Sequence, residues 1–205
     1  MLLIQSKVSP GRVSMTGPLV TVLVAIAAAV AGEVVRFSAD RARAHQWVLI
    51  ADGHGYDQHA LHSADQATQV TSMLRFVLFL AVLFAYQRWV RVGHANAMAR
   101  TDIGLGWLRA LPGGSGVIKT YLLWILSVFA SLLVTFVTSI NLQTPGDYET
   151  AANVDAGYSL VRMVLAVVLG VFVVRLTLGL NKLLATPQSA PTDEPPAELQ
   201  TLPGH

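Results

Sequence analysis

The chain has 205 residues, of which 53% are hydrophobic and only 13% are charged, and its mean hydropathy is +0.53. This composition is far too apolar for a soluble domain of this length and predicts an integral membrane protein with the lipid bilayer as a partner. The sequence contains no cysteine, which excludes disulfides, thiolate metal sites and cysteine acylation. The net charge is only +2, and the basic residues gather beside apolar runs, so nucleic acid is not an expected partner.

The first apolar run begins at Pro18, which suits the first turn of a helix, and predicts a membrane span over about 18–37. Residues 1–17 carry two basic residues and no acid, and we expect them to form a cytoplasmic segment. A basic start, a short apolar run and Ala-Val-Ala before Gly32 also resemble a cleavable signal peptide, so this alternative stays open. Ala25 and Gly32 are small residues that let a neighbouring helix approach closely.

Residues 38–69 carry charges of both signs and predict a polar extracytoplasmic connection. Its apolar run at 47–50 is too short to cross a bilayer, so we expect a strand or a segment at the membrane interface. Imidazole and carboxylate groups in this connection suit Zn or Cu and form a candidate metal site: His54, His59, His62 and Asp57. Their spacing matches no established metal motif, and a solvated loop or a pH-sensing cluster are the alternatives.

The second span is predicted over about 70–90, where every residue from Phe76 to Ala85 is apolar. A dense basic stretch follows it, and Asp102 is the only acid there. Positive charge of this density indicates the cytoplasmic side of the membrane. The basic residues of this stretch are Arg88, Arg91, Arg100, Arg109 and Lys119.

The third span, about 118–140, carries hydroxyl residues at steps of four, including Ser127, Ser131 and Thr135. We interpret them as a helix-packing seam, and a polar permeation path is the alternative. The fourth span is predicted over about 158–178, with Ala166 and Gly170 as a further small-residue pair.

The connection before the fourth span has no Lys or Arg, which supports its placement outside the cytoplasm. Residues 185–205 are rich in proline and poor in large apolar side chains, and predict a disordered cytoplasmic tail. Residues 18–184 are then the transmembrane domain.

Three charged residues are predicted to lie about one turn inside the outer boundary of three different spans: Glu33, Arg75 and Arg162. A charge at this depth is costly unless it meets a partner or a water-filled cavity, so we expect Glu33 to pair with Arg75 or Arg162. Because two cations share one anion, the cluster is also a candidate site for an anionic lipid or substrate headgroup.

The predicted fold class is therefore an all-α integral membrane bundle of four transmembrane helices in the cell membrane, with both termini in the cytoplasm. Outside the spans this topology places eight basic residues inside and three outside, in agreement with the positive-inside rule. The inner residues are Lys7, Arg12, Arg88, Arg91, Arg100, Arg109, Lys119 and Lys182, and the outer ones are Arg36, Arg41 and Arg43.

Three stretches of the chain carry a family resemblance: FLAVLFAYQRWVRVGHANAMA, GLGWLRALPG and VVRLTLGLNKL. In these stretches the chain resembles the membrane proteins that carry the domain of unknown function 4328, from about Phe76 onward. The resemblance implies a four-helix membrane domain and no known chemistry.

The spans contain packing seams but no nucleophile with its base, no acid–base pair and no deep haem-ligating histidine. We therefore expect a non-enzymatic accessory or scaffold subunit of a larger bacterial-type membrane protein complex, with other membrane subunits as partners and no cofactor. The alternative is a small oligomeric transporter or channel, which the hydroxyl residues of the third span and the charges at Glu33 and Arg75 motivate. A metal-dependent activity of the outer connection ranks third.

Overall fold

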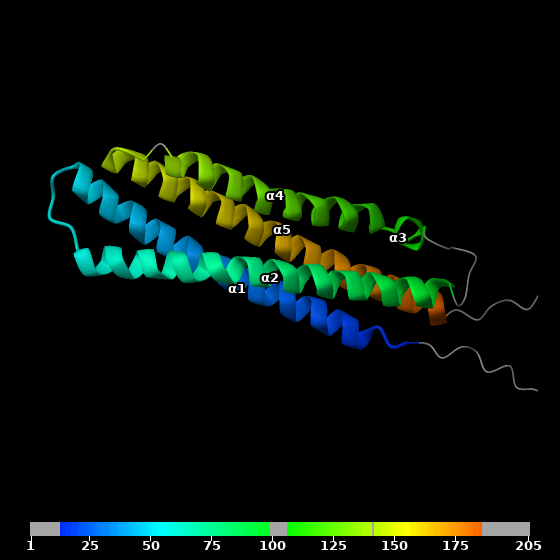
Figure 1. Cartoon of the computed structure of the whole chain (residues 1–205). Helices are drawn as coiled ribbons and strands as arrows, with labels where there is room; N and C mark the ends of the chain where they lie inside the picture. The colour runs from blue at the N-terminus through cyan, green and yellow to red at the C-terminus, as the bar shows by residue number, and fades with distance from the viewer. Residues whose placement is uncertain (1–12, 99–105, 141, 186–205) are drawn as a thin grey trace, which may run out of the picture.

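The structure is a computed structural model that describes residues 13–98, 106–140 and 142–185, without the side chains of residues 109, 110 and 139. These residues form four long helices that lie side by side, and one short helical turn (Figure 1). The long helices are α1 (Thr16–Ala51), α2 (Gln58–Met98), α4 (Gly114–Ile140) and α5 (Pro145–Ala185), and α3 is the turn Trp107–Ala110. Each long helix is apolar and long enough to cross a membrane, so the predicted all-α membrane bundle is confirmed.

Several predicted features lie outside the described residues. They include most of the N-terminal segment, the middle of the basic stretch with Arg100, and the tail from residue 186 onward.

The helices are longer than the membrane is thick. With a rise of 1.5 Å per residue, the 36 residues of α1 and the 41 residues of α2 extend over about 54 and 61 Å. The hydrocarbon core is only about 30 Å thick. The bundle therefore continues as helix beyond the hydrocarbon core.

The first connection is much shorter than the sequence predicted. Residues 38–51 and 58–69 are helical, and only residues 52–57 link α1 to α2. This corrects the expectation of a strand at 47–50, which is part of the last turns of α1. The physical reason is that no glycine or proline stands between residues 33 and 52 to end the helix. Gly53, with φ at +69°, then makes the turn that other residues rarely adopt.

Local sequence explains where α5 begins. The Thr144 backbone N–H donates to Asp147 Oδ2 over 2.8 Å, and the Asp147 backbone N–H donates to Thr144 Oγ1 over 3.3 Å. This reciprocal pair caps the first turn, in which Pro145 has the fixed φ that a helix start requires.

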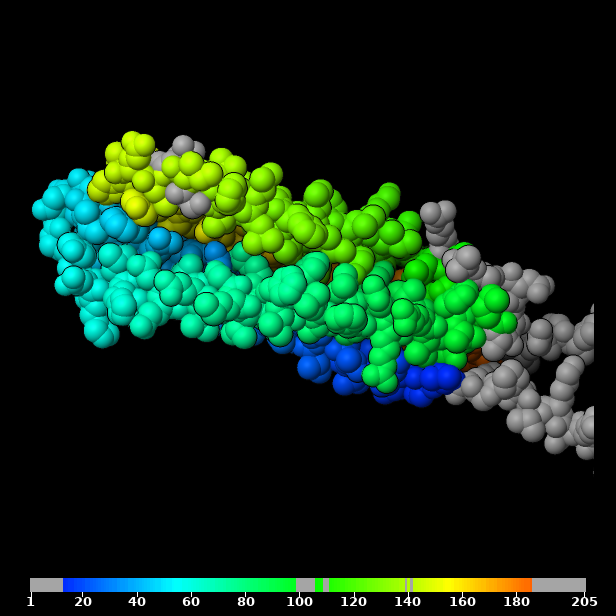
Figure 2. Space-filling view, in the orientation of Figure 1, coloured from blue at the N-terminus to red at the C-terminus, as the bar shows by residue number. Residues whose placement is uncertain are grey.

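The helices follow one another around the bundle in the order α2, α1, α5, α4. The most extensive contacts join α1 to α5 and α1 to α2, while α4 packs on α5. In the described part of the chain α2 and α4 meet mainly through aromatic rings, as in the stacked pair Tyr86–Tyr121, whose centroids lie 4.0 Å apart. Figure 2 shows the resulting seam between α2 and α4, with α1 and α5 beneath it.

We call the end of the bundle that contains Trp89 and Trp107 the aromatic end. Trp89 is fully buried, and its indole N–H donates to Thr177 Oγ1 over 2.9 Å, which ties α2 to α5. Trp107 packs so closely on Gly93 that a Cβ at this position would lie 2.6 Å from the indole ring. The ring centroids of Trp89 and Trp107 lie 5.8 Å apart. The start of α1 and the end of α5 lie at this same end (Figure 1).

Candidate functional site

The candidate site is a buried cluster of charged side chains, which we call the ion network. It lies between the middle of the bundle and the α1–α2 turn, and it contains three arginines and three acids. Helical spacing brings them together, because residues three, four and seven positions apart share one face of a helix. Its members are Glu33, Arg36 and Asp40 of α1, Arg75 of α2, and Asp155 and Arg162 of α5.

Glu33 and Arg162 form the tightest pair of the network. Arg162 Nε lies 2.8 Å from Glu33 Oε1 and Arg162 Nη2 lies 2.9 Å from Glu33 Oε2, so the contact is bidentate. Arg162 is 1% exposed, and its Nη2 also donates to Ser159 Oγ over 3.2 Å. Two parallel charge-assisted hydrogen bonds fix the orientation of both groups as well as their distance. This pair joins α1 to α5.

Arg75 makes a looser contact with the same carboxylate. Its Nε lies 3.7 Å from Glu33 Oε1, beyond hydrogen-bond distance, and has no hydrogen-bond partner among the described residues. Both oxygens of Glu33 are already bound by Arg162. Arg75 is therefore the least neutralised cation of the network.

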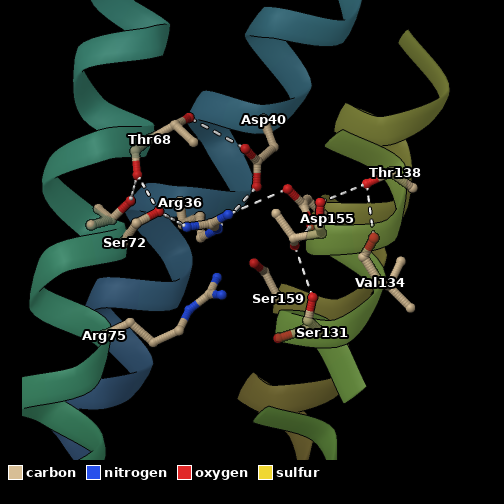
Figure 3. A network of polar contacts seen from close by, with 12 residues as sticks. Arg36, Asp40, Thr68, Ser72, Arg75, Ser131, Val134, Thr138, Asp155 and Ser159 are labelled. Carbon is tan, nitrogen blue, oxygen red and sulfur yellow. Dashed lines mark hydrogen bonds and ion pairs between the residues drawn. The ribbon is translucent and has the colours of Figure 1, made fainter. Parts of the chain in front are cut away.

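Arg36 is the centre of the second half of the network (Figure 3). It donates to Ser72 Oγ of α2, and its Nη2 donates to Asp155 Oδ2 of α5 over 3.3 Å. Its Nε also lies 3.4 Å from Asp40 Oδ2, one turn further along α1. One guanidinium group thus contacts three helices.

Hydroxyl groups donate further hydrogen bonds to two of the acids. Thr68 donates to Asp40 Oδ1 over 3.3 Å, and Thr135 of α4 donates to Asp155 Oδ1 over 3.0 Å. Asp40 has no exposed surface. Through these bonds the ion network reaches all four long helices.

The balance of charge in the network determines how far pairing offsets the cost of burying its ions. Each buried ion costs several kcal/mol to desolvate, and only close pairing with further hydrogen bonds offsets that cost. The three cations and three anions balance one another, and Arg36, Asp40 and Arg162 are each at most 3% exposed. Four buried atoms of the network nevertheless have no hydrogen-bond partner among the described residues: Arg36 Nε, Asp40 Oδ2, Arg75 Nε and Arg162 Nη1. Any shift of a helix would separate these charges in a low dielectric, so the network favours one placement of the helices.

A small cavity lies beside the network. It is lined by apolar residues of all four long helices and by the polar side chains of Glu33, Arg36, Thr71, Arg75 and Arg162. Its volume of about 20 Å³ is sufficient for one water molecule. Arg162 Nη1 is a buried donor without a hydrogen-bond partner among the described residues.

The structure brings together the three intramembrane charges that the sequence singled out, Glu33, Arg75 and Arg162. Sequence reasoning missed Arg36, which it counted among the outer charges. The spacing of Arg36 and Asp40, an i,i+4 pair of opposite sign, was the available signal for a continuing helix.

The predicted metal residues do not form a metal site. His54, His59 and His62 are exposed, and the described residues contain no group of three or more His, Asp or Glu placed to hold a metal ion. Asp57 instead begins α2, where its Oδ1 accepts the backbone N–H groups of His59 and Ala60 over 2.9 and 3.0 Å. A carboxylate at this position satisfies helix donors that would otherwise lack partners.

The predicted packing residues of α1 and α5 lie between helices. A Cβ at Gly32 would lie 2.9 Å from Leu78 Cδ1, so α2 approaches α1 closely there. Ala166 is buried, Ala25 packs against the core, and a Cβ at Gly170 would lie 3.8 Å from side chains of α1.

The hydroxyl groups of α4 bind mainly their own helix. Ser127 donates to the carbonyl of Trp124 over 2.7 Å, and Ser131 donates to that of Val128 over 2.9 Å. Thr135 bonds both the Ser131 carbonyl and Asp155. These donors are therefore occupied within the bundle.

The fold and the ion network together define a class: a multi-pass all-α membrane protein whose helices are joined by buried ion pairs. Compared with known proteins, the chain matches no protein-family model, no curated protein and no solved structure. The resemblance to proteins with the domain of unknown function 4328 stays a prediction.

Proposed function

We propose that this protein is a non-enzymatic accessory or scaffold subunit of a larger membrane protein complex. The observation that carries the proposal is the ion network, in which three cations and three anions bind one another across the bundle. Such an arrangement holds helices at fixed positions. A rigid bundle with a wide apolar exterior suits a protein that positions its neighbours in the bilayer.

The face of α4 is the best candidate for contact with a neighbouring subunit. This helix packs mainly on α5, and it exposes large apolar side chains along its length. They include Leu126, Phe129, Leu133 and Phe136, each more than half exposed. An apolar face of this kind suits either lipid or a partner helix, and crosslinking distinguishes the two.

Site-specific photo-crosslinking in native membranes tests the proposal. A photoreactive residue at Leu126 or Leu133 should give one protein adduct of constant mass, at a fixed ratio to this chain after purification in mild detergent. The same residue at Val24, which is exposed on α1, serves as the control for lipid-facing positions. Lipid adducts alone at all three positions, together with a protein that purifies as a monomer, would overturn the proposal.

A small oligomeric transporter or channel is the second candidate. The observation that favours it is the cavity beside Glu33, Arg75 and Arg162, since charges at membrane depth often mark a substrate path. Flux into liposomes that is lost with Glu33→Gln would rank this function first. Liposomes that show no flux for a panel of small ions, with a protein that binds its partner at fixed ratio, would leave the subunit proposal in place.

For the topology we infer that both termini lie in the cytoplasm. In the four-span topology both termini lie on the same side of the membrane. The inference rests on the excess of Lys and Arg on that side. A reporter that is active only in the cytoplasm, fused to residue 205, should be active. A silent reporter on a well-expressed protein would contradict the inference.

A further inference from the structure

A groove between α2 and α4 opens on the surface of the bundle next to the ion network. Its volume is about 100 Å³, and its walls are apolar except for Ser72 and Arg75. Phe76 and Phe79 form the α2 wall, and Phe129 and Leu132 form part of the α4 wall. Figure 2 shows the seam in which it lies. The groove is thus a narrow apolar slot with a cation in its wall.

Arg75 is this cation, and one of its hydrogen-bond donors has no acceptor within the described part of the bundle. Its side chain is nine-tenths buried, yet its Nε has no hydrogen-bond partner among the described residues. The nearest carboxylate, Glu33, lies 3.7 Å away and is bidentately bound to Arg162. Figure 3 shows Arg75 pointing from α2 into the space between the helices. A buried donor without a partner is costly, so an acceptor that reaches Arg75 gains more than at the surface.

The groove and the small cavity of the network are neighbours that share wall residues. Arg75, Phe79 and Val128 line both. Arg75 therefore stands between a slot that opens to the membrane and the buried carboxylates. An anion that enters along the slot meets Arg75 before it meets Glu33.

The depth of Arg75 fits a lipid headgroup. Val70 and Met73 are exposed apolar residues on α2, and the sequence predicts that the second span begins at about residue 70. Arg75 is five positions beyond Val70, which is about 7.5 Å along the helix. Long arginine side chains reach the headgroup level from such a depth. A phosphate and a guanidinium group can then meet near the membrane boundary.

We propose that this groove binds one anionic phospholipid from the leaflet nearest the α1–α2 turn. Its phosphate pairs with Arg75, since a guanidinium group matches phosphate geometry with two parallel hydrogen bonds. One acyl chain lies in the slot against Phe76, Phe129 and Leu132. The lipid supplies the acceptor that Arg75 lacks and covers the space that α2 and α4 leave between their backbones.

Native mass spectrometry of the full chain in mild detergent tests this, with phosphatidylglycerol and phosphatidylcholine added separately. The wild-type protein should retain one phosphatidylglycerol about tenfold more tightly than phosphatidylcholine, and Arg75→Gln should remove that preference. Arg88→Gln is the matched control, because it also removes one positive charge from α2 but at an exposed position away from the groove. It should keep the bound lipid.

A second pair of variants tests the slot without touching a charge. Leu132→Trp fills the groove and should expel the lipid, whereas Leu133→Trp places the same bulk at an exposed position outside it and should not. This pair keeps the proposal testable if Arg75→Gln does not fold. Equal retention of phosphatidylglycerol by wild type and Leu132→Trp would overturn the proposal. So would equal retention of both lipids by the wild type, or release of the lipid by inorganic phosphate alone.

A second copy of this chain is the other outcome that would overturn the proposal. A cysteine introduced at Leu132, in a chain with no natural cysteine, should stay monomeric under oxidation in lipid nanodiscs. Efficient disulfide dimerisation at this position would show that another helix, and not a lipid, occupies the groove.

Discussion

The two halves of the bundle hold their helices together in different ways. In the half nearer the α1–α2 turn, the helices are joined by a network of ion pairs between arginines and acids. Its tightest contact is the hydrogen-bonded pair of Glu33 and Arg162. At the aromatic end, Trp89 is fully buried and Trp107 fits against Gly93. There the Trp89–Thr177 hydrogen bond joins side chains of α2 and α5.

The difference follows from what each mechanism requires in a membrane. Apolar side chains gain little by leaving lipid for protein, so the aromatic end depends on close fit and dispersion. Ion pairs gain strength as water is excluded, but they fail if one partner is missing. We therefore expect the aromatic end to lose little stability when a hydrogen bond is removed and much stability when side-chain volume is removed. The ion network should lose much stability when a charge is removed, even if the side-chain volume is kept.

Trp89→Ala should give the largest loss of stability. It removes a fully buried ring from the contact between α2 and α5, and a void of this kind costs about 3 to 5 kcal/mol. Thermal unfolding in lipid nanodiscs measures it. Trp89→Phe is the control, since it keeps most of the volume and loses mainly the hydrogen bond to Thr177, with an expected cost of about 1 kcal/mol. Equal losses of stability for Trp89→Ala and Trp89→Phe would contradict the claim that packing of the ring stabilises the aromatic end.

Glu33→Gln should give the next largest loss. The variant keeps the shape but leaves Arg162 and Arg75 without their shared anion. Breaking a buried pair costs about 3 to 5 kcal/mol, and because Glu33 is 13% exposed we expect about 2 to 3 kcal/mol. Denaturation in mixed micelles measures the free energy of unfolding. Glu33→Asp should fall between wild type and Glu33→Gln, because it keeps the charge at a shorter reach.

Gly93→Ala tests the fit of the aromatic end. A Cβ at this position would stand 2.6 Å from the Trp107 ring, which must then move. Overpacking of this kind costs about 1 to 3 kcal/mol, and tryptophan fluorescence should shift as Trp107 becomes more exposed. Gly157→Ala is the control, because its Cβ would meet nothing within 4 Å. If Gly93→Ala changed neither the stability nor the fluorescence, Trp107 would have space to move away from residue 93, contrary to the close fit in the structure.

Arg43→Gln should give the smallest effect. Arg43 Nε lies 3.0 Å from Asp65 Oδ1, and Asp65 is 39% exposed, so solvent screens the pair. Exposed pairs contribute about 0.2 to 1 kcal/mol. Thermal melts at low and high salt should differ little between this variant and wild type. A loss as large as that of Glu33→Gln would show that the ion network extends further toward the α1–α2 turn than the buried contacts indicate.

The sequence predicted the bundle because hydrophobicity over about 20 residues is a strong local signal. It also identified Glu33, Arg75 and Arg162, since a charge inside an apolar run is conspicuous. It could not choose between the two arginines as the partner of Glu33, because that choice depends on the rotation of three helices about their axes. The bidentate geometry assigns the closer contact to Arg162.

Other errors came from treating the end of hydrophobicity as the end of the helix. Asp40 was assigned to the first connection because its surroundings are polar, and Arg36 was counted among the outer charges, but α1 continues through both. Nothing local in the sequence marks Thr135 as the partner of Asp155, which lies on the next helix. Contacts of this kind depend on tertiary placement and leave no pattern in the sequence.

A double-mutant cycle on Glu33 and Arg162 tests the central claim most directly. The free energy of unfolding is measured in lipid nanodiscs for wild type, Glu33→Gln, Arg162→Gln and the double variant. If the pair holds α1 to α5, the double variant should recover part of the loss, with a coupling energy of about 1 to 3 kcal/mol. The same cycle with Arg75 should give a smaller coupling, because its contact is 3.7 Å long. Strictly additive losses for Glu33 and Arg162 would contradict the claim that the ion network fixes the bundle.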